Sequence, residues 1–171
     1  MKKSTSISVL VLVSLAVGIS HVGWAALDNG ILLNLDGRHI DIVGMAKDRY
    51  TKISRNCSSV SRLKPEDKEY QSAVRLIIEY SPPHSQSVQL SSAWGAGKWT
   101  LAEAEFADLL PAVVLIDNSE VEPKIVGNAI WSGYTHPWKA APCILDYLSR
   151  QAPDAPLPLL ACFDPQLRAF M

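Results

Sequence analysis

The spacing of apolar and polar residues changes several times along the chain, and each change predicts an element of secondary structure. Between Leu33 and Ile42 the two kinds alternate on both sides of Asp36-Gly37. This predicts a β-hairpin, because Asp-Gly accepts the positive φ angles of a tight turn. Short apolar runs between Val88 and Trp131 are separated by turn residues, which predicts three or four antiparallel strands.

The C-terminal part of the chain follows a helical period instead. Apolar residues recur at positions i, i+3, i+4, i+7 and i+8, in the set Ala140, Cys143, Ile144, Tyr147 and Leu148. This stripe predicts a helix that Pro153 ends, followed by a second short element at 159–163. The predicted fold class is α+β, with an antiparallel sheet of about five strands and a C-terminal helix and short helical element packed on it.

Two segments before the sheet are harder to interpret. The basic, serine-rich stretch 47–64 predicts mostly irregular structure. From Pro65 to Tyr80 the apolar residues fit both a helical and a strand period. Proline suits a helix start, while the end of the segment is β-branched and aromatic. The pattern therefore predicts a short helix that runs into a strand.

The beginning of the chain has the features of an export signal. Two lysines precede an apolar stretch at 7–19, which is shorter than the roughly 20 residues of a membrane-spanning helix. The small residues Gly23 and Ala25 predict cleavage after Ala25; the alternative is an uncleaved membrane anchor. We expect residues 1–25 to be a cleavable signal peptide and residues 26–171 to form a single globular domain. The mature protein would be periplasmic or secreted, with no stable membrane span after cleavage.

The net charge and its distribution along the chain limit the class of partner that we expect. Cleavage would remove two of the 16 basic residues and leave 14 against 17 acidic ones, a net charge of −3 that does not indicate nucleic acid. The charge is uneven, because 38–68 holds eight basic and four acidic residues while 103–164 holds nine acidic and three basic ones. Two interpretations stay open: the parts face each other within the fold, or the acidic part is a docking face.

Three cysteines in an exported chain predict one disulfide and one further thiol. We expect Cys143 to pair with Cys162, because the first lies on the helical stripe and the second follows a proline-rich connector that could turn the chain back. Closing that loop would stabilise the fold by about 3 kcal/mol in the chain-entropy model. No pair has the C-x-x-C spacing of a thiol–disulfide oxidoreductase.

The chain shows no assembled catalytic set, so we predict no catalytic residue, no metal ligand and no cofactor. The histidines lie far apart without H-E-x-x-H spacing, and Ser132 lacks the glycine that opens G-x-S-x-G. A dyad of Cys143 and His136 is disfavoured by the short, proline-containing path between them. Glu103 and Glu105 share one face of a predicted strand, and we interpret them as part of a solvated sheet face.

The best candidate site is the aromatic loop from Trp131 to Trp138. Aromatic side chains beside glycine and proline in a loop are typical of binding surfaces, because they offer large contact area at small entropic cost. The alternative is that these rings pack the junction of sheet and helix. We expect an acidic turn to act together with the loop and to steer a basic partner. The candidate residues of the two segments are Trp131, Tyr134, His136, Trp138, Asp117, Glu120 and Glu122.

Together these features favour a non-enzymatic protein that binds another envelope or secreted protein with a basic surface. In general plan the chain resembles the periplasmic immunity proteins and enzyme inhibitors. The shared features are a signal peptide, a small domain, a disulfide near the C-terminus and an acidic part of the chain. The resemblance covers no diagnostic motif, so it implies no residue roles. Two alternatives are an accessory component of an envelope machine, such as a conjugation or secretion apparatus, and a small periplasmic hydrolase that uses His136 or Ser132.

Overall fold

The computed structural model describes residues 21–167, and residue contacts divide them into two compact units, 21–46 and 47–167. Most of the predicted signal peptide, residues 1–20, lies outside the described residues. The proposed cleavage site after Ala25 falls within the first strand, β1 (Val22–Leu27). The single domain expected over 26–171 stays a prediction.

The first unit confirms the predicted hairpin. Strands β2 (Gly30–Leu35) and β3 (Arg38–Ile40) are antiparallel, and both residues of the Asp36-Gly37 turn have positive φ angles, 50° and 80°. The hairpin belongs to a separate three-stranded sheet in the order β1-β2-β3. It ends before Ile42, because the carboxylate of Asp41 accepts a hydrogen bond of 2.7 Å from the backbone N–H of Gly44 and thereby caps a helix.

That helix, α2 (Ile42–Ser54), corrects the prediction that the basic stretch is mostly irregular. The boundary between the two units falls within it. The part of α2 that belongs to the second unit carries Lys47 and Lys52, which form ion pairs with Asp146 and Asp164 at 2.8 and 3.1 Å. These ion pairs join part of the basic segment to the acidic C-terminal segment within the second unit, in line with the first of the two charge interpretations.

The second unit is built on a five-stranded antiparallel sheet, as predicted. Its strands follow one another along the chain in the order β4-β5-β6-β7-β8. They are β4 (Ser61–Arg62), β5 (Gln89–Ala96), β6 (Trp99–Glu105), β7 (Ala112–Asp117) and β8 (Lys124–Ser132). A short 3₁₀ helix, η1 (His84–Ser87), precedes β5.

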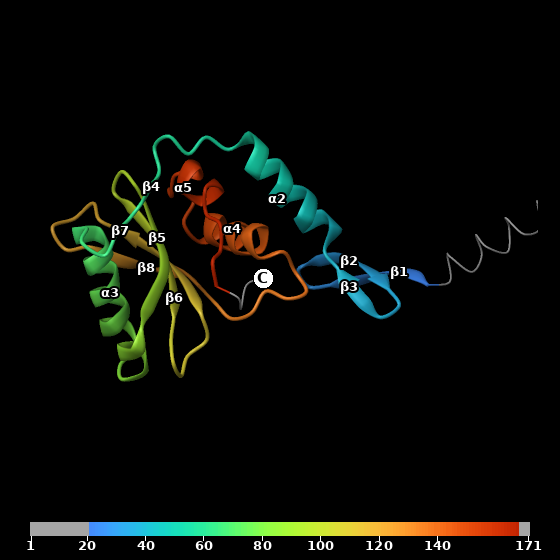
Figure 1. The fold of residues 1–171 in the computed structure, drawn as a ribbon, viewed down its shortest axis with the longest axis horizontal. Helices are drawn as coiled ribbons and strands as arrows, with labels where there is room; N and C mark the ends of the chain where they lie inside the picture. The colour runs from blue at the N-terminus through green and yellow to red at the C-terminus, as the bar shows by residue number, and fades with distance from the viewer. Residues whose placement is uncertain (1–20, 168–171) are drawn as a thin grey trace, which may run out of the picture. The chain divides into compact units, whose positions relative to one another are not determined.

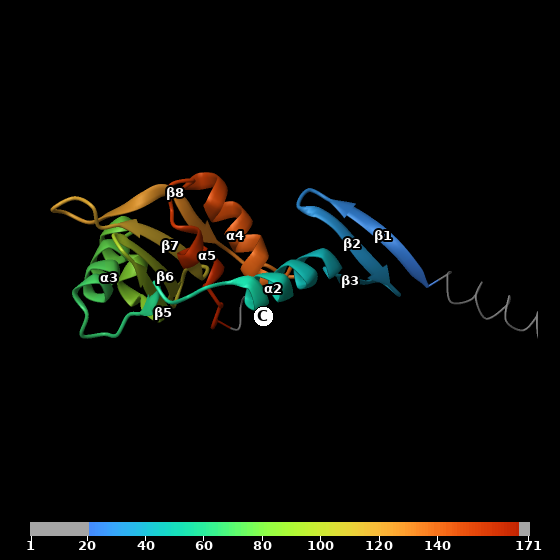
Figure 2. The same ribbon diagram turned by 90° about the horizontal axis from the view of Figure 1, so that it is seen from above.

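Helices cover both faces of this sheet (Figures 1 and 2). Helix α3 (Lys68–Tyr80) packs on one face; α4 (Ala140–Gln151) and α5 (Leu157–Ala161) pack on the other. Side chains alternate between the two cores along each central strand. In β6, for example, Leu101 belongs to the α4 side and Ala102 to the α3 side, and both are fully buried.

Two predictions for the helical segments have different outcomes. The helical stripe is confirmed as α4, which ends at Gln151 shortly before Pro153. The segment expected to change from helix to strand is helical to its end at Tyr80. Ala73 and Ile77 lie four residues apart and bury the same side of α3 against the sheet. Burial of this helical face therefore outweighs the strand preference of the β-branched residues at that end.

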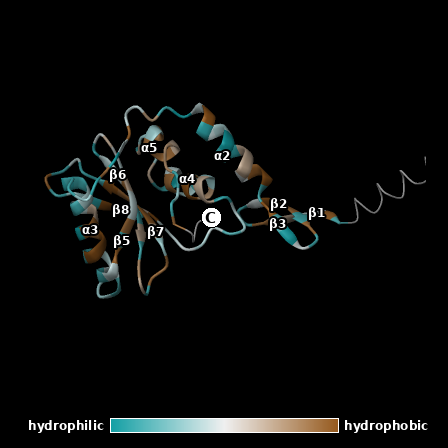
Figure 3. Ribbon diagram, viewed as in Figure 1, coloured by the Kyte–Doolittle hydropathy of each residue, from teal (hydrophilic) through white to brown (hydrophobic). Residues whose placement is uncertain are grey.

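Hydropathy is unevenly distributed within the helices. Figure 3 shows hydrophobic and hydrophilic residues side by side along α3. Within residues 21–167 no helix is both long enough and apolar enough to cross a membrane.

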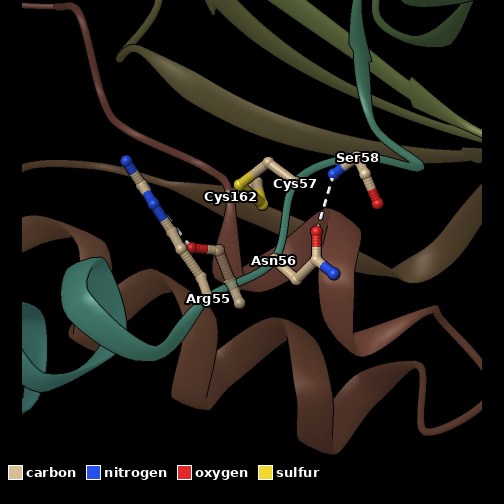
Figure 4. Close-up of a disulfide and its surroundings, with 6 residues drawn as sticks. Arg55, Asn56, Cys57, Ser58 and Cys162 are labelled. Carbon is tan, nitrogen blue, oxygen red and sulfur yellow. Dashed lines mark hydrogen bonds between the residues drawn. A yellow bond between two sulfur atoms is a disulfide. The ribbon is translucent and has the colours of Figure 1, made fainter.

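The disulfide joins the end of the α2 segment to the end of α5. Figure 4 shows the bond between Cys57 and Cys162, whose Cα atoms are 5.8 Å apart and whose positions differ by 105 residues. The predicted pairing of Cys143 with Cys162 is therefore wrong, and Cys143, half-buried on α4, is not part of this bond. Beside the bond, the guanidinium of Arg55 donates a hydrogen bond of 3.4 Å to the carbonyl oxygen of Ala161.

Candidate functional site

An open groove of about 560 Å³ lies at one end of the five-stranded sheet. It forms there because β6 ends, β7 begins and β8 ends at the same edge, as the pairing of Ala104 with Ala112 and of Ala112 with Ser132 requires. Its apolar lining comes from Phe106, Leu109, Pro111, Tyr134 and Leu167, and its polar lining from Ser91, Glu105 and Gln166.

Tyr134 is the part of the groove best suited to contact a partner. Its side chain is 66% exposed although it is large and mainly apolar. It follows Gly133, which has a φ of 129° and donates a backbone hydrogen bond of 3.0 Å to Pro111. A residue with a side chain would be strained at that φ, so the glycine lets the chain leave β8 beside the start of β7.

Ser91 reaches the groove through an irregularity in β5. The pairing of β5 with β6 shifts between Leu90 and Ser92, which leaves Ser91 as an extra residue in its strand. Such a bulge turns a side chain away from the regular alternation. The Ser91 hydroxyl donates a hydrogen bond of 3.3 Å to the carbonyl oxygen of Glu103.

The C-terminal side of the groove is formed by residues 164–167, which we call the strap. Its last two residues, Gln166 and Leu167, line the groove. Their backbone N–H groups donate hydrogen bonds of 2.8 and 2.9 Å to one carboxylate oxygen of Glu103, and Ser92 donates one of 2.8 Å to the other. Glu103 is 0% exposed, so the solvated sheet face predicted for this residue is wrong; Glu105 is exposed as expected.

A second, smaller hollow of about 270 Å³ also borders the strap. Its lining includes Asp48, Lys52, Lys139, Asp164 and Gln166. Burial lowers the pKa of Lys52, but its hydrogen bonds and charge interactions with Asp164 and Asp48 outweigh burial and raise it. The two cations and two carboxylates balance each other, so this hollow presents no strong net charge.

Of the predicted aromatic loop, the structure brings only Tyr134 into the groove lining. Trp131 is half-buried and packs against the core on the α4 side, which is the packing role considered as an alternative. His136 is exposed, and Trp138 is half-buried in the turn that leads to α4. The backbone N–H of Trp138 donates a hydrogen bond of 2.8 Å to the carbonyl oxygen of Thr135.

The acidic turn is not beside the aromatic loop. Register pairs Ala112 with Ser132 at one end of β7 and Asp117 with Lys124 at the other. The two predicted halves of the surface therefore lie at opposite ends of these strands, about 17 Å apart at 3.3 Å per residue. Figure 1 shows the turn between β7 and β8 and the loop after β8 leaving the sheet in opposite directions.

Lysines offset much of the charge in the acidic turn. Asp117 lies 3.8 Å from Lys98, and Glu120 forms an ion pair with Lys124. The hydrogen bond from the side chain of Ser119 is the largest cause that lowers the pKa of Asp117. The backbone N–H of Ser119 lowers it further, while burial acts in the opposite direction. Glu120 raises the pKa of Lys124 by a hydrogen bond and by its charge. Asp117 is thus held as a carboxylate that organises the turn.

The residues considered for catalysis are not grouped around the groove. Ser132, His136 and Cys143 are absent from its lining. Among residues 21–167, no group of three or more His, Cys, Asp or Glu side chains is arranged to hold a metal ion. The groove itself offers one exposed carboxylate, two hydroxyls and one amide among its apolar side chains, which suits recognition of a mixed apolar and polar surface.

Sequence reasoning missed most of this site. Phe106 and Leu109 carry a signal that could have been used, since they are large apolar residues in a short connection between two strands. Glu103 carries none, because its role depends on Ser92 and the strap, 11 and more than 60 residues away. Comparison with known families, curated proteins and solved structures finds no match for this chain.

Proposed function

We propose that the protein is an exported, non-enzymatic binding protein of the immunity-protein or enzyme-inhibitor type, and that the groove is its contact site. The observation that carries this proposal is the exposed Tyr134 at the edge of a partly apolar groove. Tyrosine is enriched among the residues that dominate binding energies, because it buries a large area and still offers a hydroxyl. The carboxylate of Glu105 adds a preference for a partner that brings a basic group beside its apolar anchor.

The disulfide supports the proposed compartment. Disulfides persist in the periplasm and outside cells, whereas the cytosol keeps thiols reduced. The bond between Cys57 and Cys162 ties two distant segments of the second unit, and Cys162 is buried, so it belongs to the folded core.

We predict that the mature protein begins at Ala26. Intact-mass measurement of the protein from the periplasm should then show a chain that lacks residues 1–25. Such a protein would also lack Val22 to Ala25, four of the six residues of β1 that pair with β2. A mass that includes Met1 would contradict the cleavage and favour the membrane-anchor alternative.

Tyr134 should crosslink the partner. A photoreactive amino acid at position 134, introduced into the protein in intact cells, should give a specific adduct that mass spectrometry can identify. The matched control is position 121, because Val121 is fully exposed in the acidic turn at the opposite end of β7 and β8. Adducts of equal yield and identity at both positions would contradict a groove-specific contact.

With the identified partner purified, Tyr134→Ala should weaken binding by about 2 kcal/mol or more, mainly through a faster dissociation rate. Charge reversal at Glu120 and Glu122 should instead change the binding kinetics little, because the acidic turn lies at the opposite end of β7 and β8 and exposed charges at that distance are largely screened by salt. Surface-binding kinetics on folded variants measures both. A Tyr134→Ala protein that binds as tightly as the wild type would refute the proposal, and hydrolysis of an ester, peptide or glycan by the wild type would favour the enzyme alternative.

A further inference from the structure

The strap borders two hollows, the groove of about 560 Å³ and the smaller hollow of about 270 Å³, and Gln166 lines both. A segment beside open space has fewer close contacts than a fully packed one. Leu167 is the exception, because its side chain is 7% exposed and packs in the core on the α4 side. The position of the strap therefore depends on this packing and on a small number of polar attachments.

Those attachments differ in strength. Cys162 fixes the chain just before the strap through its disulfide, and Phe163 is buried beside it. The ion pair of Asp164 with Lys52 joins two partly exposed side chains, and such pairs contribute little to stability. At the far end, Glu103 accepts hydrogen bonds from both Gln166 and Leu167.

Glu103 is well suited to be the main attachment. Hydrogen bonds from backbone N–H groups to an ionised carboxylate are roughly twice as strong as neutral ones. The carboxylate is itself oriented by the hydroxyl of Ser92, the residue paired with it in the neighbouring strand. Glu103 thus transfers the rigidity of the central sheet to the last residues of the strap.

We propose that Glu103 is the positioning residue of the groove: its carboxylate holds the strap as the groove wall, and the strap opens as a local unit when this attachment is weakened. The importance of that wall for a partner rests on the proposed function. The attachment itself does not, because it can be measured on the protein alone.

The test is hydrogen exchange of backbone amides, followed by NMR on the full mature, disulfide-bonded protein. Glu103→Gln keeps the shape of the side chain but replaces one accepting oxygen by an amide group that only donates. The amides of Gln166 and Leu167 should exchange about tenfold faster in this variant, because the hydrogen bonds of both pass from a charged acceptor to a neutral one and charge-assisted bonds are roughly twice as strong. Amides of β6 and β7 should change much less.

The matched control is Ile77→Val, a substitution in the core on the opposite face of the sheet. It should speed the exchange of the slowest amides of the sheet by about fivefold through lower global stability, without a selective effect on the strap. Signals of Leu109 and Tyr134 should shift with Glu103→Gln and not with Ile77→Val, because these residues share the groove with the strap.

Two results would overturn the proposal. In one, the amides of Gln166 and Leu167 exchange at the wild-type rate in Glu103→Gln. In the other, they accelerate only as much as the amides of β6 and β7, so that the strap opens solely by global unfolding. Neither result depends on a partner, so a failure here is distinct from a failure of the Tyr134 experiments.

Discussion

Replacing Cys57 and Cys162 together by alanine should lower the free energy of unfolding by about 3 to 5 kcal/mol. The chain-entropy model gives about 4.7 kcal/mol for a loop of roughly 100 residues, and these two cysteines are 105 residues apart. The loop closed by the bond contains α3 and all strands of the larger sheet, so its loss would enlarge the unfolded ensemble of nearly the whole second unit. Urea unfolding monitored by tryptophan fluorescence would measure the change.

The control for this experiment is Cys143→Ala. Cys143 lies outside the disulfide and is half-buried, so its replacement should cost about 1 kcal/mol or less. Peptide mapping without reductant should recover Cys57 and Cys162 in one crosslinked fragment. A large loss of stability with Cys143→Ala, or a fragment that joins Cys143 to Cys162, would contradict the bond seen in the structure.

The second large effect is expected at the centre of the sheet, where Leu101→Ala should destabilise the protein by about 3 to 5 kcal/mol. Leu101 is fully buried in β6, opposite Leu115 in β7, and belongs to the core formed with α4 and α5. The helices cover this face, so the cavity left by the missing side chain would be closed to water and only partly filled by relaxation. Thermal and urea unfolding of the variant would test this.

Leu157→Ala is the matched control for Leu101→Ala. It is the same chemical change in the short helix α5, but the Leu157 side chain is 74% exposed. Its removal should alter stability by about 0.5 kcal/mol at most. Equal effects of the two substitutions would mean that the α4 side of the sheet is not the closed core described above.

The local pattern of the sequence was sufficient where one period dominated. The stripe from Ala140 to Leu148 predicted α4, and Asp36-Gly37 predicted the hairpin, because each signal lies within a few neighbouring residues. The apolar runs predicted the antiparallel sheet for the same reason, and with it the α+β class. The pattern failed in 65–80, where helical and strand periods overlapped and burial of Ala73 and Ile77 decided for a helix.

The candidate site was predictable only at Tyr134. The sequence marked the aromatic loop as unusual, but it could not show that Trp131 packs inward while Tyr134 lines a groove. It also could not show that the acidic turn lies at the other end of the sheet, since that follows from the register of β7 and β8.

By itself, the sequence determined the hairpin, the antiparallel strands, helix α4 and the chemical character of each segment, because these depend on side chains close together in the chain. Only the tertiary structure decided which distant segments meet. It paired Cys162 with Cys57 rather than with Cys143, and it placed the strap over Glu103. Spacing along a chain carries no information about such contacts, because they form when helices and strands bury their apolar faces together.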